Sequence, residues 1–178
     1  MIIQTKYAQI KNNELYIDDV RVSDLVKQYG TPLYVMSEGH LRDKLEELQD
    51  FMNQYEKSLP LFASKSFSCL AMYKLIKEYN IGIDCVSAGE MSIALKAGVD
   101  PDKIYFHGNN KTREELQYAL EVGVGTIVID NDYEYEMINE IVRESGNTVD
   151  VLLRINTGID AHTHEYIKTA KDDSKFGY

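Results

Sequence analysis

Three residues that could take part in chemistry stand in or beside short apolar runs, where charged side chains are unusual. Lys65 comes directly after one run, Asp84 lies within the next, and Arg154 lies within the last. Burying a charged group costs free energy unless that group is paired. The three residues therefore predict one of two things. Either Asp84 and Arg154 form a buried ion pair that supports the fold, or all three line a polar site.

The amine of Lys65 could attack an aldehyde. It follows Phe62-Ala63-Ser64, so we expect it at the carboxyl end of a strand. Catalytic groups of βα folds collect at that end of the strands. A lysine that loses part of its solvent there more readily becomes the neutral nucleophile that such an attack requires. The alternative is an ordinary exposed lysine at the end of a strand.

Several histidines stand at positions where they could serve a site. His107 follows the third apolar run and is close to Asn109 and Asn110. A histidine there acts either as a structural hydrogen-bonding residue or as part of the site. His162 and His164 form a His-x-His pair with no third ligand at metal spacing, so we predict a solvated loop and no metal site.

The composition is that of a globular protein and argues against several functional classes. The 178 residues carry 29 acidic against 19 basic side chains, a net charge of −10, which disfavours nucleic-acid binding. No apolar run approaches the roughly 20 residues of a membrane span, and no signal-peptide pattern opens the chain. Cys69 and Cys85 show neither metal-binding spacing nor a disulfide framework. We expect a cytoplasmic protein with reduced thiols.

A regular alternation of apolar runs and helical patterns predicts what positions these residues. The runs begin at residues 59, 81, 103, 125 and 149, which are 22, 22, 22 and 24 residues apart. That spacing fits a strand plus a helix and predicts parallel strands in chain order. The predicted helices cover residues 68–79, 89–97, 112–122 and 132–144.

Local signals mark the ends of several elements. Thr112 and Glu115 fit a capping box, and Gly98 and Gly123 stand where left-handed helix ends are expected. Before the alternation begins, Asn12-Asn13 predicts a turn between short strands. Leucines at helical spacing then predict an amphipathic helix over residues 38–57.

Five strand–helix units suit two architectures. They would complete a flavodoxin-like open sheet, or they would form about five of the eight units of a (β/α)₈ barrel. No G-x-G-x-x-G follows the first strand, so the best sign of a dinucleotide-binding fold is missing.

The order of these motifs resembles the fold-III pyridoxal-phosphate-dependent decarboxylases, which include diaminopimelate, ornithine and arginine decarboxylases. Phe62-Ala63-Ser64-Lys65 stands where that family has Tyr-Ala-x-Lys, and the segment from Asp84 to Glu90 resembles its Asp-x-x-Ser-x-x-Glu. The segments from Phe106 to Lys111 and from Arg154 to His164 are similar to the diaminopimelate branch. Ser174-Lys175-Phe176-Gly177 resembles the family's Ser-Lys-Phe-Gly.

The chain departs from the family pattern at two places. Ser66-Phe67 stands after the lysine where Ala-Asn is usual, and Thr157 stands where proline usually follows Arg-Ile-Asn. Both departures leave the lysine and the arginine in place, so they bear on local geometry and substrate preference.

The resemblance implies a fold, a cofactor and a site. Residues 37–178 would form the N-terminal part of a (β/α)₈ TIM barrel, and residues 1–36 would be a lead-in that belongs to a separate β-domain. Pyridoxal 5'-phosphate would be the cofactor, with Lys65 as the catalytic residue. Its cofactor-binding residues would be Lys65, Asp84, His107 and Arg154.

The implied reaction is decarboxylation of a small-molecule amino acid. In the full-length enzyme this would convert meso-2,6-diaminopimelate to L-lysine and carbon dioxide, a step of lysine biosynthesis. Another basic amino-acid decarboxylase is the alternative. The resemblance also implies a homodimer, a later histidine, a glycine-rich phosphate loop, a glutamate at the ring nitrogen and a C-terminal β-domain.

None of these later parts lies before Tyr178, so we expect a truncated barrel that is inactive by itself. We also expect an open sheet edge after the fifth strand, covered by a partner copy or by swapped elements.

Three rival hypotheses remain at this point. An alanine-racemase-like enzyme shares the barrel and the lysine but not the Arg154–His164 pattern. A pyridoxal-phosphate carrier or a non-catalytic regulatory homologue would use the same barrel without the reaction. A flavodoxin-like domain would need no cofactor at all.

Overall fold

The computed structural model describes residues 5–157 and 177–178. The chain divides into two compact units, Met1–Ser58 and Leu59–Tyr178. The domain boundary expected between residues 36 and 37 stays a prediction.

The first unit contains a small antiparallel sheet and two helices. Its elements are β1 (Ala8–Lys11), β2 (Glu14–Ile17), β3 (Val20–Arg21), α1 (Val22–Tyr29) and α2 (Glu38–Met52). The strands pair in the order β1-β2-β3. The predicted turn is present, and both asparagines have positive φ, 51° at Asn12 and 66° at Asn13, as a tight hairpin turn requires.

Helix α2 ends at Met52, earlier than the predicted end at residue 57. The hydroxyl of Ser58 donates to the carbonyl oxygens of Met52 and Tyr55, at 3.2 and 2.9 Å. Lys57 adopts a φ of +61°, which interrupts helical geometry. Local capping therefore overrides the leucine periodicity on which the longer prediction rested.

The second unit contains a five-stranded parallel sheet. Its strands are β4 (Leu61–Ala63), β5 (Gly82–Cys85), β6 (Ile104–Phe106), β7 (Thr126–Ile129) and β8 (Asp150–Leu153). They lie in chain order, and every neighbouring pair is parallel. Both the topology and the five strand positions confirm the sequence-based prediction.

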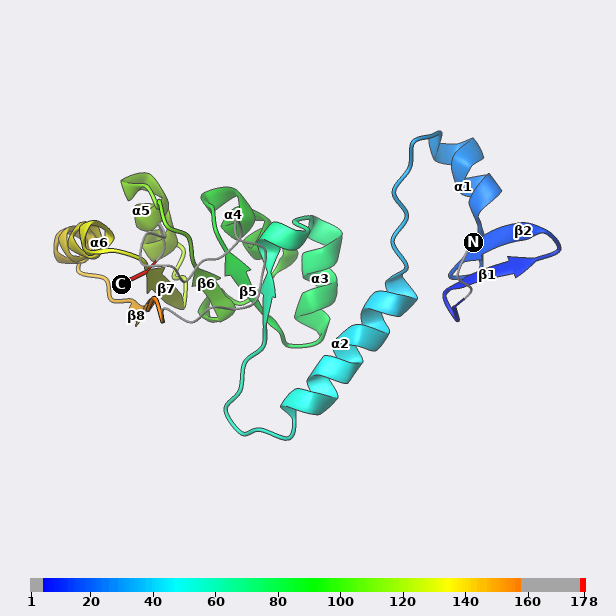
Figure 1. The fold of residues 1–178 in the computed structure, drawn as a ribbon. Helices are drawn as coiled ribbons and strands as arrows, with labels where there is room; N and C mark the ends of the chain where they lie inside the picture. The colour runs from blue at the N-terminus through cyan, green and yellow to red at the C-terminus, as the bar shows by residue number, and fades with distance from the viewer. Residues whose placement is uncertain (1–4, 158–176) are drawn as a thin grey trace. The chain divides into compact units, whose positions relative to one another are not determined.

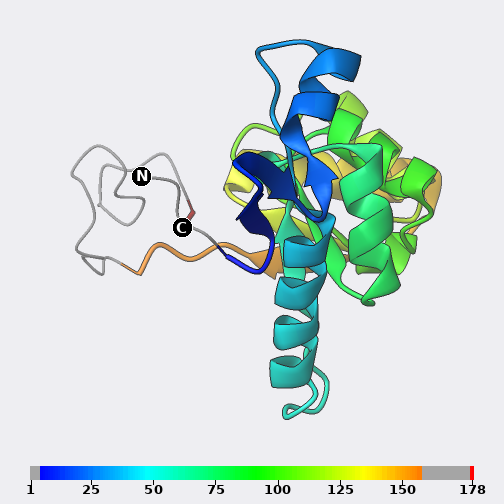
Figure 2. The ribbon, with the colours of Figure 1, turned by 90° about the vertical axis from the view of Figure 1, so that its right-hand side faces the viewer.

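Four helices connect these strands and lie on one side of the sheet (Figures 1 and 2). They are α3 (Leu70–Glu78), α4 (Ala88–Ala97), α5 (Arg113–Glu121) and α6 (Asp132–Ser145), with short 3₁₀ turns η1 (Ser64–Ser66) and η2 (Pro101–Lys103). Each helix packs against the next in chain order. This is the arrangement that successive right-handed crossovers produce.

The predicted helix ends are present. Thr112 accepts from the backbone N–H of Glu115, and the Glu115 carboxylate accepts from the backbone N–H of Thr112, which completes the capping box. Gly98 ends α4 in the left-handed conformation, and Gly123 has a φ of +75° just after α5.

The core lies between the sheet and its helices. Alternate residues of the three central strands point to this side and are at most 1% exposed: Ile83, Cys85, Ile104, Phe106, Ile127 and Ile129. The intervening residues face the other side of the sheet, as the two-residue period of a strand requires. The polar residues at the carboxyl ends of the strands lie on this second face, opposite the helices.

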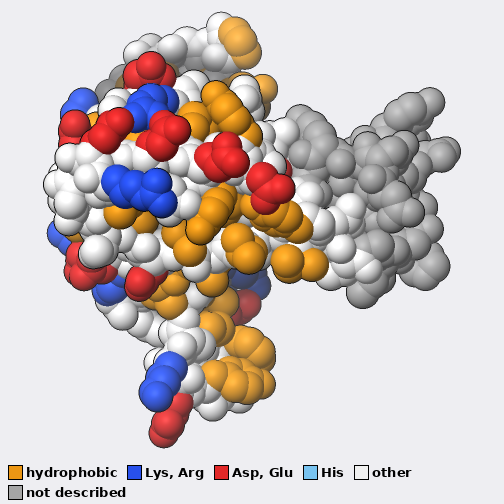
Figure 3. All heavy atoms as spheres, turned by 90° about the vertical axis from the view of Figure 1, so that its left-hand side faces the viewer, with side chains coloured by type: hydrophobic (Ala, Val, Ile, Leu, Met, Phe, Trp, Pro, Cys, Tyr) orange, Lys and Arg blue, Asp and Glu red, His pale blue; other side chains and the backbone are white. Residues whose placement is uncertain are grey.

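Strand β8 exposes all four of its residues. Its apolar Val151, Leu152 and Leu153 are 44%, 52% and 57% exposed. Figure 3 shows hydrophobic side chains gathered among acidic ones on the face of the molecule that α6 and β8 present.

Just beyond β8, the backbone of Tyr178 donates to the carbonyl of Arg154 and accepts from the N–H of Asn156. That bonding pattern is the one a parallel neighbouring strand makes.

Candidate active site

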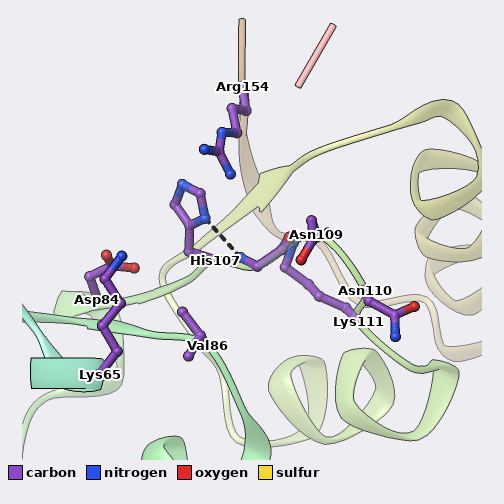
Figure 4. Close-up of a pocket in the computed structure, with 9 residues that line it drawn as sticks. Lys65, Asp84, Val86, His107, Asn109, Asn110, Lys111 and Arg154 are labelled. Carbon is purple, nitrogen blue, oxygen red and sulfur yellow. Dashed lines mark hydrogen bonds between the residues drawn. The ribbon is translucent and has the colours of Figure 1, made fainter. Parts of the chain in front are cut away.

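A cavity of about 510 Å³ lies at the carboxyl ends of the parallel strands. Its lining includes all four residues that the sequence predicted for the site, Lys65, Asp84, His107 and Arg154, each from a different strand end (Figure 4). The remaining lining residues are Val86, Gly108, Asn109, Asn110 and Lys111. The structure thus confirms that the four residues gather, while their individual roles stay predictions.

Lys65 lies in η1, two residues beyond the end of β4. The preceding residue, Ser64, is buried, and its hydroxyl donates to Oε2 of Glu90 at 2.6 Å. The same Glu90 oxygen accepts from the backbone N–H of Val86 at 2.6 Å. Glu90 therefore ties the end of β4 to the end of β5. Lys65 itself is exposed, so the desolvation expected from its position is not observed.

Asp84 points to the cavity side of β5. Its Oδ1 atom is buried and has no hydrogen-bond partner among the described residues. Burial raises the pKa of this carboxyl, while a protonated His107 and the ammonium of Lys65 would act in the opposite direction. A buried acceptor without a partner is costly in a folded protein, so a ligand that donates a hydrogen bond to Oδ1 would remove this cost.

His107 follows β6 and is held at two points. Its backbone N–H donates to the carbonyl of Cys85 at 2.7 Å, which extends the pairing of β5 and β6 into the site. Its Nδ1 accepts from the backbone N–H of Gly108 at 2.7 Å. Burial lowers the pKa of His107, so the neutral ring is favoured. Since Nδ1 is an acceptor, the ring proton resides on Nε2.

Arg154 pairs with Asp130, so the alternative of a buried Asp84–Arg154 pair, which the sequence left open, is not observed among the described residues. Its Nη1 donates to Oδ1 of Asp130 at 3.1 Å, and Asp130 is only 2% exposed. Sequence reasoning missed Asp130, although the signal was present. Asp130 directly follows the apolar run of β7, in the same way that the other site residues follow or end theirs.

Lys111 and Glu134 form a buried ion pair that the sequence did not reveal. Their side chains are 1% and 2% exposed, and Nζ lies 2.6 Å from Oε1. Both residues occupy polar stretches next to helix starts, where charged side chains are normally solvated, so composition gives no signal. The pair lies beside the cavity, because Lys111 is one of its lining residues.

Two other kinds of site do not occur in the part of the chain that the structure describes. No group of three or more His, Cys, Asp or Glu side chains there could hold a metal ion. No helix among the same residues has the length and apolar character needed to cross a membrane. His162 and His164 lie outside the described residues, so their assignment to a solvated loop stays a prediction.

The fold and the site together define a class. A parallel strand–helix domain presents a lysine amine, a carboxylate, a neutral imidazole and a guanidinium to one cavity. This set suits an aldehyde cofactor that carries an anionic group, since the amine can attach the aldehyde and the arginine can bind the anion. This combination is typical of the class of strand–helix domains that bind such a cofactor.

Comparison with known proteins identifies the family. Residues 38–178 match the family described as pyridoxal-dependent decarboxylase, pyridoxal binding domain. The match covers most of the chain, and the chain belongs to this family. This match confirms the predicted family and pyridoxal phosphate as the family's cofactor. The predicted α/β fold with a partial TIM barrel is confirmed by the solved structures of relatives.

Individual relatives agree with this assignment. The chain is 42% identical over 179 residues to diaminopimelate decarboxylase of Bacillus subtilis and 43% identical over 173 residues to that of Staphylococcus aureus. It covers 41% and 40% of their lengths. The crystal structure of diaminopimelate decarboxylase from M. jannaschii in co-complex with L-lysine matches 97% of this chain and 41% of that one, with 33% identity and a TM-score of 0.84.

Proposed function

We propose that this chain forms the pyridoxal-phosphate-binding part of an amino-acid decarboxylase. One observation carries the proposal. The amine of Lys65 shares one cavity at the strand ends with the buried Oδ1 of Asp84, which has no hydrogen-bond partner among residues 5–157 and 177–178. An amine that must attach an aldehyde needs an acceptor nearby to orient it and to hold a proton. The rest of the cavity supplies donors for the cofactor's anionic and polar groups.

Each side chain then has a role that its environment supports. Lys65 attaches the cofactor through its amine, and its exposure leaves it free to reach into the cavity. Asp84 accepts a hydrogen bond from a protonated nitrogen at the site. Arg154, fixed by Asp130, offers charge-assisted hydrogen bonds to an anionic group. When bound, pyridoxal phosphate takes up the electron pair that remains when carbon dioxide departs.

We further propose meso-2,6-diaminopimelate as the substrate of the complete enzyme, with L-lysine and carbon dioxide as products. Support comes from the relatives named diaminopimelate decarboxylase at 42–43% identity and from the M. jannaschii structure that holds L-lysine. Another basic amino acid is the alternative. Release of carbon dioxide by the product of the complete gene, compared for meso-diaminopimelate, lysine, ornithine and arginine, tests this choice. Release from none of them would favour a carrier or a regulatory homologue.

The cofactor proposal has a direct spectroscopic test. Titration of the chain with pyridoxal phosphate should produce the absorbance band of a lysine adduct, and Lys65→Ala should abolish it. Lys74→Ala is the matched control, because Lys74 is an exposed lysine on α3 that does not line the cavity. A band that survives in Lys65→Ala, or that is lost equally in Lys74→Ala, would contradict the proposal.

Two further proposals concern the complete protein. We propose a homodimer, as the family resemblance implies, and light scattering of the product of the complete gene tests it. A cytoplasmic location is proposed because Cys69 and Cys85 are both free thiols, which suits a reducing compartment. Cell fractionation tests the location.

A further inference from the structure

The ammonium group of Lys111 connects three elements around the cavity. Its Nζ donates to the carbonyl of Gly108 at 2.8 Å, to the carbonyl of Val128 at 2.6 Å, and to Oε1 of Glu134 at 2.6 Å. An ammonium has three protons, so these acceptors use all of them. The acceptors come from the loop after β6, from β7 and from the first turn of α6.

The surroundings leave this ammonium little freedom. The side chain of Lys111 is 1% exposed, and its Nζ also lies 5.4 Å from the ring centroid of Phe106. The backbone of Glu134 is held in turn, because its N–H donates to Oδ1 of Asn131 at 3.0 Å. Burial lowers the pKa of Lys111 and raises that of Glu134, whereas their mutual contact opposes both shifts. Three well-placed acceptors favour the ammonium form.

Gly108 is the point where this cluster meets the site. Its carbonyl accepts from Lys111, and its N–H donates to Nδ1 of His107 at 2.7 Å (Figure 4). Its φ of +119° is one that residues with a side chain rarely adopt. The backbone N–H of Gly108 is therefore held in the orientation in which it donates to Nδ1 of His107.

We propose that Lys111 and Glu134 are a positioning pair that sets the orientation and the tautomer of His107 at the site. The chain of contacts runs from Glu134 through Lys111 and Gly108 to the imidazole. It leaves the ring proton on Nε2, which can donate to a ligand. The importance of this donor rests on the proposed function, but the tautomer itself does not.

The tautomer can be measured without cofactor. In the chain labelled with ¹⁵N-histidine, two-bond ¹H–¹⁵N spectra at about pH 8 report which ring nitrogen carries the proton of a neutral imidazole. The His107 signals are assigned by their loss in His107→Gln. The wild-type chain should show an unprotonated Nδ1 and a protonated Nε2. The reverse pattern would overturn the proposal.

The pair is then removed without leaving a buried charge. The double variant Lys111→Met, Glu134→Leu replaces both buried charged side chains with apolar ones. Circular dichroism checks that this variant is folded. His107 should lose the wild-type pattern and show averaged signals of both tautomers. The matched control, Arg113→Met with Glu140→Leu, removes an exposed ion pair between α5 and α6 and should leave His107 unchanged. An unchanged His107 in the Lys111 and Glu134 double variant would overturn the proposal.

A measurement on the wild-type chain covers the case in which that variant does not fold. The three ammonium protons of Lys111 should exchange slowly enough with water to be seen in ¹H–¹⁵N spectra of ¹⁵N-lysine protein. Absence of such a signal would overturn the proposal. None of these three measurements uses pyridoxal phosphate, and the absorbance titration does not use the His107 or Lys111 signals. The positioning role of Lys111 and Glu134 and the binding of pyridoxal phosphate can therefore fail independently.

Discussion

Arg154 and Asp130 are neighbours across the strand ends of β7 and β8, and Nη1 of the arginine donates to Oδ1 of the aspartate at 3.1 Å. The aspartate is 2% exposed, whereas the arginine side chain is 24% exposed and reaches the cavity. The buried carboxylate thus fixes an arginine that still faces a ligand. It also leaves Asp84 without this arginine as its partner.

Removing the arginine should leave a buried carboxylate without this cation. We expect Arg154→Met to lower the free energy of unfolding by about 2 kcal/mol, less than the loss for a fully buried pair because Arg154 is partly solvated. Arg154→Lys should recover part of the loss, since it keeps the charge but offers a single donor group. Urea unfolding measures both variants. A loss below about 0.5 kcal/mol in Arg154→Met would contradict the importance of this pair.

Asp84 should make the stability depend on pH. Burial raises the pKa of its carboxyl, so its folded pKa exceeds its unfolded value. Such a group contributes stability that is full below the unfolded pKa, and that contribution is lost as pH rises through the folded pKa. Asp84→Asn should therefore be more stable than the wild type at about pH 7, by about 1 kcal/mol, and should gain little at about pH 4.

Urea unfolding at the two pH values measures this difference. Asp50→Asn, which changes an exposed carboxylate on α2, is the matched control and should show no such dependence. An equal gain in stability of Asp84→Asn at both pH values would contradict the raised pKa of Asp84. A variant less stable than the wild type at about pH 7 would also contradict it.

The buried pair of Lys111 and Glu134 should dominate the local energetics. We expect Lys111→Met to cost about 3–5 kcal/mol, because it leaves the Glu134 carboxylate buried and without its cation. Adding Glu134→Leu should recover most of this loss, since apolar side chains of similar volume replace such pairs at little cost. Chemical denaturation of the single and double variants measures the recovery.

The pair of Arg113 and Glu140, 2.8 Å apart and with side chains 34% and 61% exposed, provides the comparison, and Arg113 also pairs with Glu144 at 2.9 Å. Arg113→Met should cost less than about 1 kcal/mol, because exposed ion pairs contribute little. Equal losses in Arg113→Met and Lys111→Met would show that burial of the second pair is energetically unimportant. A double variant no more stable than Lys111→Met would contradict the recovery.

The sequence was informative wherever the physical signal is local. Apolar runs at a nearly constant spacing were sufficient for five parallel strands in order, and Thr112 with Glu115 was sufficient for a helix start. The gathering of Lys65, Asp84, His107 and Arg154 also followed, because parallel strands bring their carboxyl ends to one edge. The two-residue period of strands then puts alternate residues on the cavity side.

The remaining features depend on contacts between residues distant in the chain. The partner of Arg154 could not be chosen from the sequence, because pairing depends on which strands are adjacent, and β8 is next to β7 rather than β5. Lys111 and Glu134 lie 23 residues apart, and nothing in either local sequence indicates burial. The exposure of Lys65 could not be read from its apolar neighbours, because the chain turns into η1 directly after β4.

The most direct test of the central claim is to locate the bond between the chain and the cofactor. The chain is incubated with pyridoxal phosphate and reduced with borohydride, which makes the attachment permanent, and peptide mass spectrometry then finds the modified residue. We expect modification at Lys65, retained in the Lys74→Ala control and reduced at least tenfold at that site in Asp84→Asn. Modification spread evenly over exposed lysines, or concentrated at a lysine other than Lys65, would contradict it.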